Sequence, residues 1–291
     1  MTATIERPMS PGAVWSRRLG VFSIVLLATI VLAHRYRLVT TPDLAPLLGT
    51  TLAVALAGLA AGLVAHRRYW YFGDRGGPDI LLGVFWSLVT IAPFLVGAWW
   101  YLAYPKLADI STDLENPPSL AEAARLRTPD MNAIGDPTPE SIIEQAEAYP
   151  LVEGHRYELP MDRVLAAVED IVARRGWPVT ATRDSVGVAF ETTIEAIAHS
   201  LVWGLPADVA VRVTDMGGAT FVDMRSASRY GAHDLGGNAA RIVGFLTELD
   251  AMMAAQAGTA PVRAGPAEEE DDAPTVEIPD EAPPPTQAPQ Q

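Results

Sequence analysis

The residues best suited to chemistry follow a predicted strand in the C-terminal half of the chain. Seven polar side chains gather there: Arg225, Ser226, Ser228, Arg229, Asp234, Asn238 and Arg241. The last two belong to a predicted helix, whose N-terminus would present free backbone N–H groups and the positive end of its dipole. Guanidinium groups beside such a terminus favour an anion. The segment is therefore a candidate site for a carboxylate, phosphate or sugar-acid ligand.

A structural interpretation of the same segment competes with the ligand site. In it, Arg225 and Arg229 pair with the carboxylates of Asp208, Asp223 or Glu191, while Asp234 caps the following helix. Oppositely charged side chains on one face of a sheet commonly pair across strands. This interpretation is the favoured one for the two arginines.

Catalysis by the same loop is a weaker hypothesis. Ser226, Ser228, His233 and Asp234 are residue types that a hydrolase uses. Adjacent His and Asp side chains usually project in different directions, however, and no Gly-x-Ser-x-Gly motif is present. These residues alone do not predict a nucleophilic enzyme.

Carboxylate and metal chemistry have little support elsewhere. Glu191 and Glu195 share one face of a predicted strand, where paired catalytic carboxylates are conceivable, but a solvated sheet edge is the favoured interpretation. His155, His199 and His233 lack the spacing of metal ligands. Neither a metal nor another cofactor is expected.

The elements that must position these residues form a domain over residues 150–256. Apolar residues at helical spacing, followed by Gly176, predict a helix from Met161 to Arg175. A second helix is predicted from about Gly236 to Met253. Strands are predicted at 155–159, 177–182, 187–196, 208–213 and 220–228, with 197–203 continuing the sheet after a bend. The expected fold is α+β, a mainly antiparallel curved sheet covered by two helices and preceded by a three-helix transmembrane region.

The turn at Gly217 and Gly218 leaves one strand register open. If the two glycines alone form the loop, Arg212 faces Asp223. If 215–218 is a four-residue loop, Asp208 faces Arg225 instead. Both registers keep the valines on the core face, so the alternation of apolar residues does not choose between them.

Three uncharged apolar runs in the first third of the chain predict transmembrane helices. They are Leu19 to Ala33, Leu44 to Ala65 and Ile80 to Tyr104. A spanning helix needs about 20 apolar residues, which the first run supplies only if Trp15 and residues 34–38 lie in the interfacial zones. A cleaved signal peptide is the alternative for that run, but no Ala-x-Ala-like site closes it and two further spans follow.

Basic residues near the spans predict their orientation. One side has Arg7, Arg17, Arg18, Arg67, Arg68 and Arg75, and the other has Arg35, Arg37 and Lys106. By the positive-inside rule the N-terminus is cytoplasmic, and everything after Tyr104 is periplasmic or otherwise extracytoplasmic. Residues 105–291 carry 13 basic and 31 acidic side chains, and such an acidic part argues against nucleic-acid binding.

The predicted organisation has five segments. Residues 1–18 form a cytoplasmic tail, 19–104 three transmembrane helices, and 105–149 a Pro-rich extended segment. That segment has short helices at 119–127, with a capping box from Ser119, and at 138–148, with Thr138 as N-cap. The α+β domain follows at 150–256. Residues 257–291 form an acidic, Pro-rich tail that is too poor in apolar residues to fold.

Several stretches together resemble one protein family. They are Asp109 to Pro118, Phe190 to Ala196, Asp208 to Val213, Val222 to Arg229 and Asp234 to Ile242. These residues are similar to the domain of unknown function 1499 family, over about residues 105–250. The resemblance implies an extracytoplasmic α+β module attached to a membrane segment, and it brings no established activity. The segment Ile194 to Val209 departs from the aromatic, acidic turn expected there.

These features predict an inner-membrane protein of a bacterium. It contacts the lipid bilayer, and its periplasmic module binds an envelope protein or a small anionic ligand without catalysis. The alternative is an envelope enzyme acting on an anionic or carbohydrate substrate through the loop from Arg225 to Asn238. A deep pocket joining that loop to Glu191 or Glu195 would favour the enzyme, and a flat, ion-paired surface would favour the binding module.

Overall fold

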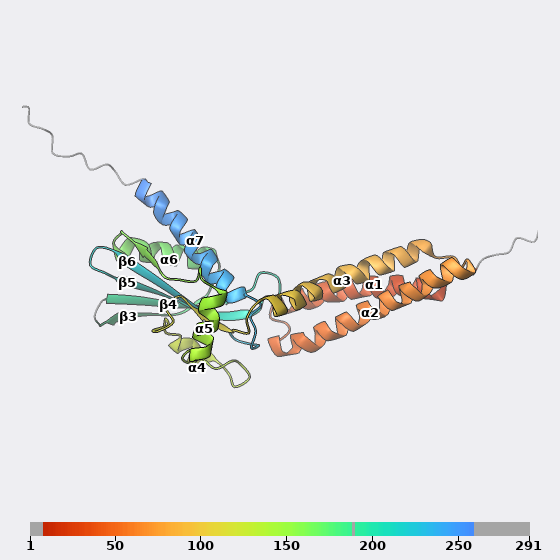
Figure 1. Ribbon diagram of the computed structural model, residues 1–291, viewed down its shortest axis with the longest axis horizontal. Helices are drawn as coiled ribbons and strands as arrows, with labels where there is room; N and C mark the ends of the chain where they lie inside the picture. The colour runs from red at the N-terminus through yellow and green to blue at the C-terminus, as the bar shows by residue number, and fades with distance from the viewer. Residues whose placement is uncertain (1–7, 188–189, 259–291) are drawn as a thin grey trace, which may run out of the picture.

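A bundle of long apolar helices and an α+β domain lie end to end along the molecule (Figure 1). The computed structural model describes residues 8–187 and 190–258 of the 291-residue chain. The predicted acidic tail lies outside the described residues from position 259 onward. The predicted fold class, an α+β domain preceded by three long apolar helices, is confirmed.

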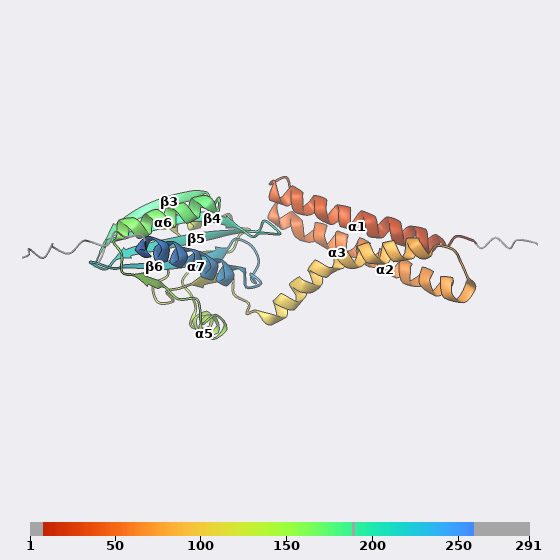
Figure 2. The same ribbon diagram turned by 90° about the horizontal axis from the view of Figure 1, so that it is seen from above.

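The bundle consists of α1 (Pro11–Arg35), α2 (Thr41–Phe72) and α3 (Gly77–Ala103). Each of the three is long and apolar enough to cross a membrane. Each also has a proline in its first turn, where the missing N–H of proline costs no helical hydrogen bond. The loop from α1 to α2 and the end of α3 lie at the end of the bundle that faces the domain (Figure 2).

Small residues bring the helices of the bundle into close contact. A Cβ atom on Gly83 would lie 2.3 Å from Oγ of Ser16, and one on Gly20 would lie 2.4 Å from the carbonyl oxygen of Gly83. Oγ of Ser16 also donates a 2.9 Å hydrogen bond to the carbonyl oxygen of Gly58. Contacts between small residues and interhelical hydrogen bonds are the interactions that associate helices in a bilayer, where burial of apolar surface gives no driving force.

The described part of the domain contains a six-stranded antiparallel sheet. Its order is β1 (Asp109–Ser111), β6 (Thr220–Ser228), β5 (Pro206–Asp215), β4 (Phe190–His199) and β3 (Val179–Val186), and β2 (His155–Tyr157) also pairs with β6. The predicted continuation of the sheet from 197 to 203 is wrong beyond His199. There the chain turns through Gly204, whose φ of 67° suits glycine, and the Ser200 hydroxyl accepts a hydrogen bond from the N–H of Leu205.

The hairpin between β5 and β6 resolves the open register. Gly217 and Gly218 alone form its loop, with φ of 74° and 143°. Arg212 is therefore opposite Asp223, as in the first of the two alternatives. Nη2 of Arg212 lies 2.8 Å from Oδ2 of Asp223, so the pairing is also an ion pair.

Two helices cover one face of the sheet. They are α6 (Met161–Arg174) and α7 (Gly237–Gly258), which lie over the strands in Figure 2. Their buried side chains meet the alternate apolar residues of β5 and β6 in one core: Val168, Ile171, Ile242, Phe245 and Leu249 with Val209, Val211, Val213, Val222 and Met224. Residues at every second strand position and along one helix stripe are the pattern expected of such a core.

The opposite face of the sheet is covered by the segment that follows the bundle. Here α4 (Ala121–Leu126) and nearby residues bury Ala210 and Ala227 beneath Leu120, Ala123 and Ile134. Glu195 is 1% exposed under this segment, so the expectation that it lies on a solvated edge is wrong.

The two short helices of this segment begin differently. The predicted capping box at Ser119 is wrong, because α4 begins after Leu120 and the Glu195 carboxylate from β4 accepts the N–H groups of Glu122 and Ala123 in its first turn. In α5 (Pro139–Ala148) the hydroxyl of Thr138 accepts the N–H of Ser141 at 3.2 Å, as predicted. The sequence predicted the cap of α5 because Thr138 directly precedes that helix. It could not predict the cap of α4, because Glu195 comes from a distant strand.

Candidate functional site

The seven polar residues singled out in the sequence do not form one cluster. Neighbouring residues of β6 project to opposite faces of the sheet. Arg225 lies on the face covered by α4, and Arg229, just beyond the strand, extends toward Asp208 on the same side. Ser226 and Ser228 lie on the face covered by α7. The sheet therefore divides the predicted anion site into two separate groups.

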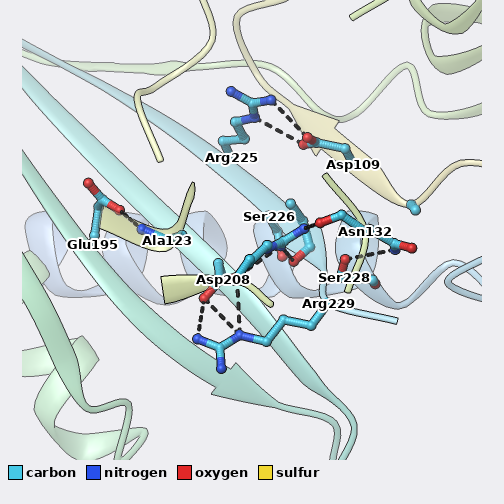
Figure 3. A network of polar contacts seen from close by, with 12 residues as sticks. Asp109, Ala123, Asn132, Glu195, Asp208, Arg225, Ser226, Ser228 and Arg229 are labelled. Atoms are coloured by element: carbon cyan, nitrogen blue, oxygen red, sulfur yellow. Dashed lines mark hydrogen bonds and ion pairs between the residues drawn. The ribbon is translucent and has the colours of Figure 1, made fainter. Parts of the chain in front are cut away.

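Arg225 is held by an ion pair that the sequence did not reveal. Its Nε and Nη2 atoms lie 3.0 and 2.8 Å from the two carboxylate oxygens of Asp109 (Figure 3). Nη2 also donates to the carbonyl oxygen of Gly135 at 2.6 Å. The predicted partners Asp208, Asp223 and Glu191 are wrong for Arg225, because β1 joins the sheet beside β6 and brings Asp109 closer.

Arg229 has the partner that the sequence predicted. Its Nη2 lies 2.7 Å from Oδ1 of Asp208, which is 2% exposed (Figure 3). Arg127 binds the other oxygen of the same carboxylate, with Nη2 2.8 Å from Oδ2. Two guanidinium groups thus share one buried carboxylate, and both ion pairs stabilise the fold.

On the α7 face, four of the predicted residues form a second network. Nη1 of Arg241 donates to Oγ of Ser226 at 2.8 Å and to Oδ1 of Asn238 at 2.6 Å. Ser226 in turn donates to Oδ1 of Asn238, whose amide nitrogen donates to Oγ of Ser228 at 3.0 Å. These bonds fix the first turn of α7 against β6.

Asp234 caps α7, as the structural interpretation predicted. Its carboxylate accepts the N–H groups of Gly236 at 2.9 Å and Asn238 at 2.6 Å. Burial raises the pKa of Asp234, although these two hydrogen bonds favour its ionised form. Neighbouring His233 accepts the N–H of Leu235 through Nδ1, and its Nε2 lies 3.1 Å from the carbonyl oxygens of Tyr101 and Tyr104. The two nitrogens of His233 are thus engaged away from the serines.

The exposed side of Arg241 faces a pocket between the domain and the bundle. The pocket has a volume of about 750 Å³ and brings four arginines and a histidine together: Arg35, Arg37, Arg175, Arg241 and His199. Arg35 ends α1, Arg37 lies in the following loop, Arg175 follows α6, and Arg241 lies in the second turn of α7. The pocket is a candidate site that the sequence reading did not assemble.

Three of these arginines form no ion pair with the described residues. Arg175 is used, because its Nη2 pairs with Glu248 at 2.9 Å. Arg35 donates to the carbonyl oxygen of Leu201 at 2.8 Å, an uncharged partner. Across residues 8–187 and 190–258, no ion pair engages Arg35, Arg37 or Arg241. None of the described residues that line the pocket is acidic.

The electrostatic field in the pocket is positive. Partial burial and the charges of Arg37, Arg229, His34 and Arg241 lower the pKa of His199. Burial also lowers the pKa of Arg241 to about 10, which leaves it charged at neutral pH. Burial is the first cause of both shifts, and the neighbouring arginines add to it: Arg37 for His199 and Arg175 for Arg241.

Direct contacts hold the two walls of the pocket together. Nδ1 of buried His34, near the end of α1, lies 2.7 Å from the carbonyl oxygen of Trp203 in the turn between β4 and β5. On the other side of the junction, the rings of Tyr101 and His233 stack with centroids 4.7 Å apart. The bundle therefore sets the position of Arg35 and Arg37 relative to Arg241.

One signal in the sequence could have pointed to this pocket. Arg35 and Arg37 lie on the side of the spans that is otherwise poor in basic residues. The positive-inside rule predicts few basic residues at one end of the spans, so two arginines at the end with fewer such residues are a feature that the sequence alone shows. By contrast, the described residues contain no group of three or more His, Asp or Glu side chains placed to hold a metal ion.

Comparison with known proteins finds a match to a protein family. A family model described as "Protein of unknown function (DUF1499)" matches residues 109–249, from β1 into α7. The match includes the sheet, α6 and the first part of α7, and it excludes the bundle with Arg35 and Arg37. No curated protein and no solved structure matches the chain.

Proposed function

Because residues 109–249 belong to the DUF1499 family of unknown function, we propose a function from the geometry of the pocket. The chain is a multi-pass protein of the bacterial inner membrane. Its N-terminus is cytoplasmic, and its periplasmic α+β domain binds a small anionic ligand where the domain meets the bundle. The lipid bilayer surrounds α1, α2 and α3.

The observation that carries this proposal is a set of guanidinium groups that form no ion pair with any carboxylate of residues 8–187 and 190–258. Arg35, Arg37 and Arg241 line one pocket of about 750 Å³, a volume within the usual range for small-molecule sites. Where an arginine of this domain serves only the fold, it forms an ion pair with a carboxylate. Arg225 pairs with Asp109 and Arg229 pairs with Asp208, both on the sheet face covered by α4. Bidentate hydrogen bonds from guanidinium to carboxylate or phosphate are strong and specific.

The arrangement of the pocket favours binding over catalysis. A deep pocket that joins the loop of residues 225–238 to Glu191 or Glu195 would favour the enzymatic alternative. Neither carboxylate lines the pocket, and Glu195 is occupied by the first turn of α4 and by Arg183. We therefore propose a binding module.

The proposed orientation is supported by the distribution of arginines along the bundle. Arg17, Arg18, Arg67, Arg68 and Arg75 lie at the end of the bundle away from the domain, as expected for a cytoplasmic side. A reporter that is active only outside the cytoplasm, fused after Gly258, should be active in cells. An inactive fusion that is nevertheless expressed would contradict the orientation.

Anion binding is tested with sulfate, whose charge is constant near neutral pH. Sulfate should raise the melting temperature of the full-length protein in a non-ionic detergent. Arg37→Gln should reduce that rise, because it removes a positive charge from the pocket lining. The fold should not change, since the described residues form no hydrogen bond or ion pair with the Arg37 side chain and the backbone N–H that binds the His34 carbonyl is retained. Arg125→Gln is the matched control, since its side chain is 78% exposed and far from the pocket. If sulfate raises the melting temperature equally in the wild-type protein and in both variants, Arg37 is not part of an anion site and the proposal is wrong.

A further inference from the structure

The pocket lies at the level where the bundle would leave the bilayer. Arg35 is the last residue of α1, and Arg37 follows it in the loop before α2. The ends of a spanning helix reach the headgroup region, where arginine side chains meet lipid phosphates. One wall of the pocket is therefore part of the membrane-spanning unit, and the opposite wall, with Arg241, is part of the domain.

Exposed apolar side chains surround this charged pocket. Leu201, which lines it, is 90% exposed, and its neighbour Val202 is 61% exposed. In the loop after α1, Tyr36 and Leu38 are 73% and 80% exposed. Large apolar residues gathered in two adjacent loops are unusual on a surface that faces only water. Apolar side chains that enter the acyl boundary while arginines reach the phosphates are typical of an interfacial surface.

We infer that the anionic ligand is the phosphate headgroup of a membrane amphiphile. Its phosphate lies between Arg35 and Arg37 on one side and Arg241 on the other, and its apolar chains remain in the bilayer beside α1. This inference rests on the proposed function, because it assigns a ligand class to the same pocket.

Size and charge both support a headgroup over a small free ion. A volume of about 750 Å³ is in the range of whole small-molecule sites and leaves room for the groups esterified to a phosphate. The guanidinium groups of Arg35, Arg37 and Arg241 supply this charge, because Asp234 already accepts the N–H groups of Gly237 and Asn238 at the start of α7. The contact of Arg35 with Leu201 keeps the apolar rim and the charged wall adjacent.

The test compares three probes on the full-length protein in non-ionic detergent. They are short-chain phosphatidylglycerol, short-chain phosphatidylcholine and inorganic phosphate, with binding followed by mass spectrometry of the intact complex and by melting temperature. Phosphatidylglycerol should bind at least about tenfold more tightly than either of the others, a difference that these methods resolve. Arg37→Gln should weaken that binding by about fivefold or more, since one charge-assisted contact is lost.

A matched control separates the pocket from general attraction between arginine and lipid. Arg67→Gln removes an exposed arginine at the opposite end of the bundle, and it should leave the affinity for phosphatidylglycerol unchanged. An equal loss in both variants would overturn the assignment to this pocket.

The other outcomes distinguish this inference from the proposed function. If inorganic phosphate binds as tightly as phosphatidylglycerol and depends on Arg37, the ligand is a free anion; the inference fails and the anion site stands. If phosphatidylcholine binds as tightly as phosphatidylglycerol, headgroup charge is not recognised and the inference fails. If no anion, sulfate included, binds in an Arg37-dependent way, the inference and the proposed function both fail.

Discussion

The carboxylate of Glu195 on β4 accepts a 2.9 Å hydrogen bond from the backbone N–H of Ala123 on α4 (Figure 3). It also accepts the N–H of Glu122 and pairs with Arg183. A strand side chain thus supplies the cap that the sequence before α4 does not. This contact attaches the segment after the bundle to the second face of the sheet.

Replacing Glu195 should destabilise the domain. Glu195→Ala leaves two buried N–H groups and Arg183 without their acceptor, at a cost of about 2–4 kcal/mol in the free energy of unfolding. The measurement is thermal unfolding of the full-length protein in detergent. Glu191→Gln, on the same strand and less buried, is the control and should change stability by less than about 0.5 kcal/mol. A wild-type melting temperature for Glu195→Ala would show that the cap contributes nothing.

The close contact of α1 and α3 predicts a clear difference between two glycines of α3. Gly83→Ala places a methyl group 2.3 Å from Oγ of Ser16 and 2.4 Å from a backbone carbon atom of Ser16, so the helices must separate. Overpacking of this kind costs about 1–3 kcal/mol. Gly97→Ala meets no atom within 4 Å and should be neutral or slightly stabilising. Bundle stability in detergent, followed by resistance to denaturation in sodium dodecyl sulfate, should fall for Gly83→Ala alone.

The junction between bundle and domain can be tested by crosslinking, because the chain contains no cysteine. Arg35→Cys combined with Leu201→Cys should crosslink efficiently with a short bismaleimide in membranes, since the Arg35 side chain reaches the backbone of residue 201. Arg35→Cys with Phe190→Cys, at the other end of β4, should not. Comparable yields for the two pairs would mean that the domain does not rest on the bundle as described.

The stability of the protein without added anions should depend on pH through His199. Its folded pKa is lowered, first by partial burial and then by Arg37, with Arg229, His34 and Arg241 adding to the effect. Between this lowered value and the unfolded value of about 6.5, the unfolded chain binds more protons, so stability rises with pH. The contribution is complete above the unfolded pKa and is lost as pH falls toward the folded pKa.

His199→Gln should flatten this dependence in melting experiments from pH 5 to 7.5. Bound sulfate should also weaken it in the wild-type protein, because an anion in the pocket favours protonated His199. Sulfate should accordingly bind more tightly at pH 5.5 than at pH 7.5, and His199→Gln should remove that difference. A sulfate affinity in wild type that does not change over this interval would place His199 outside the site.

Local patterns in the sequence predicted most of the fold. The limits of α6 follow from helical periodicity and Gly176, and the caps at Thr138 and Asp234 follow from neighbouring residues. Alternation placed Val209, Val211 and Val213 in the core but left the hairpin register open, because both registers satisfy the same pattern. The structure selected a register through the conformations of Gly217 and Gly218.

The ion pair of Arg225 and the pocket could not be predicted in the same way, because both depend on contacts between residues far apart in the sequence. Arg225 and Asp109 are 116 positions apart and meet because a three-residue strand joins the edge of the sheet, a feature too short for periodicity to indicate. The sequence suggests Arg241 as a candidate because it lies near a helix start, and in the structure Arg241 lines the pocket. The opposite wall comes from Arg35 and Arg37, about 200 positions earlier, which the sequence shows only as two basic residues after the first apolar run.

The short connection from α3 to β1 limits how far the domain can travel. Residues 104–108 alone separate Ala103 from the first strand, and five extended residues span at most about 18 Å. Since β1 is paired within the sheet, this connection also limits the distance between the whole domain and the end of α3. The domain therefore remains beside the end of the apolar bundle, and any molecule that contacts both must come to that end of the bundle.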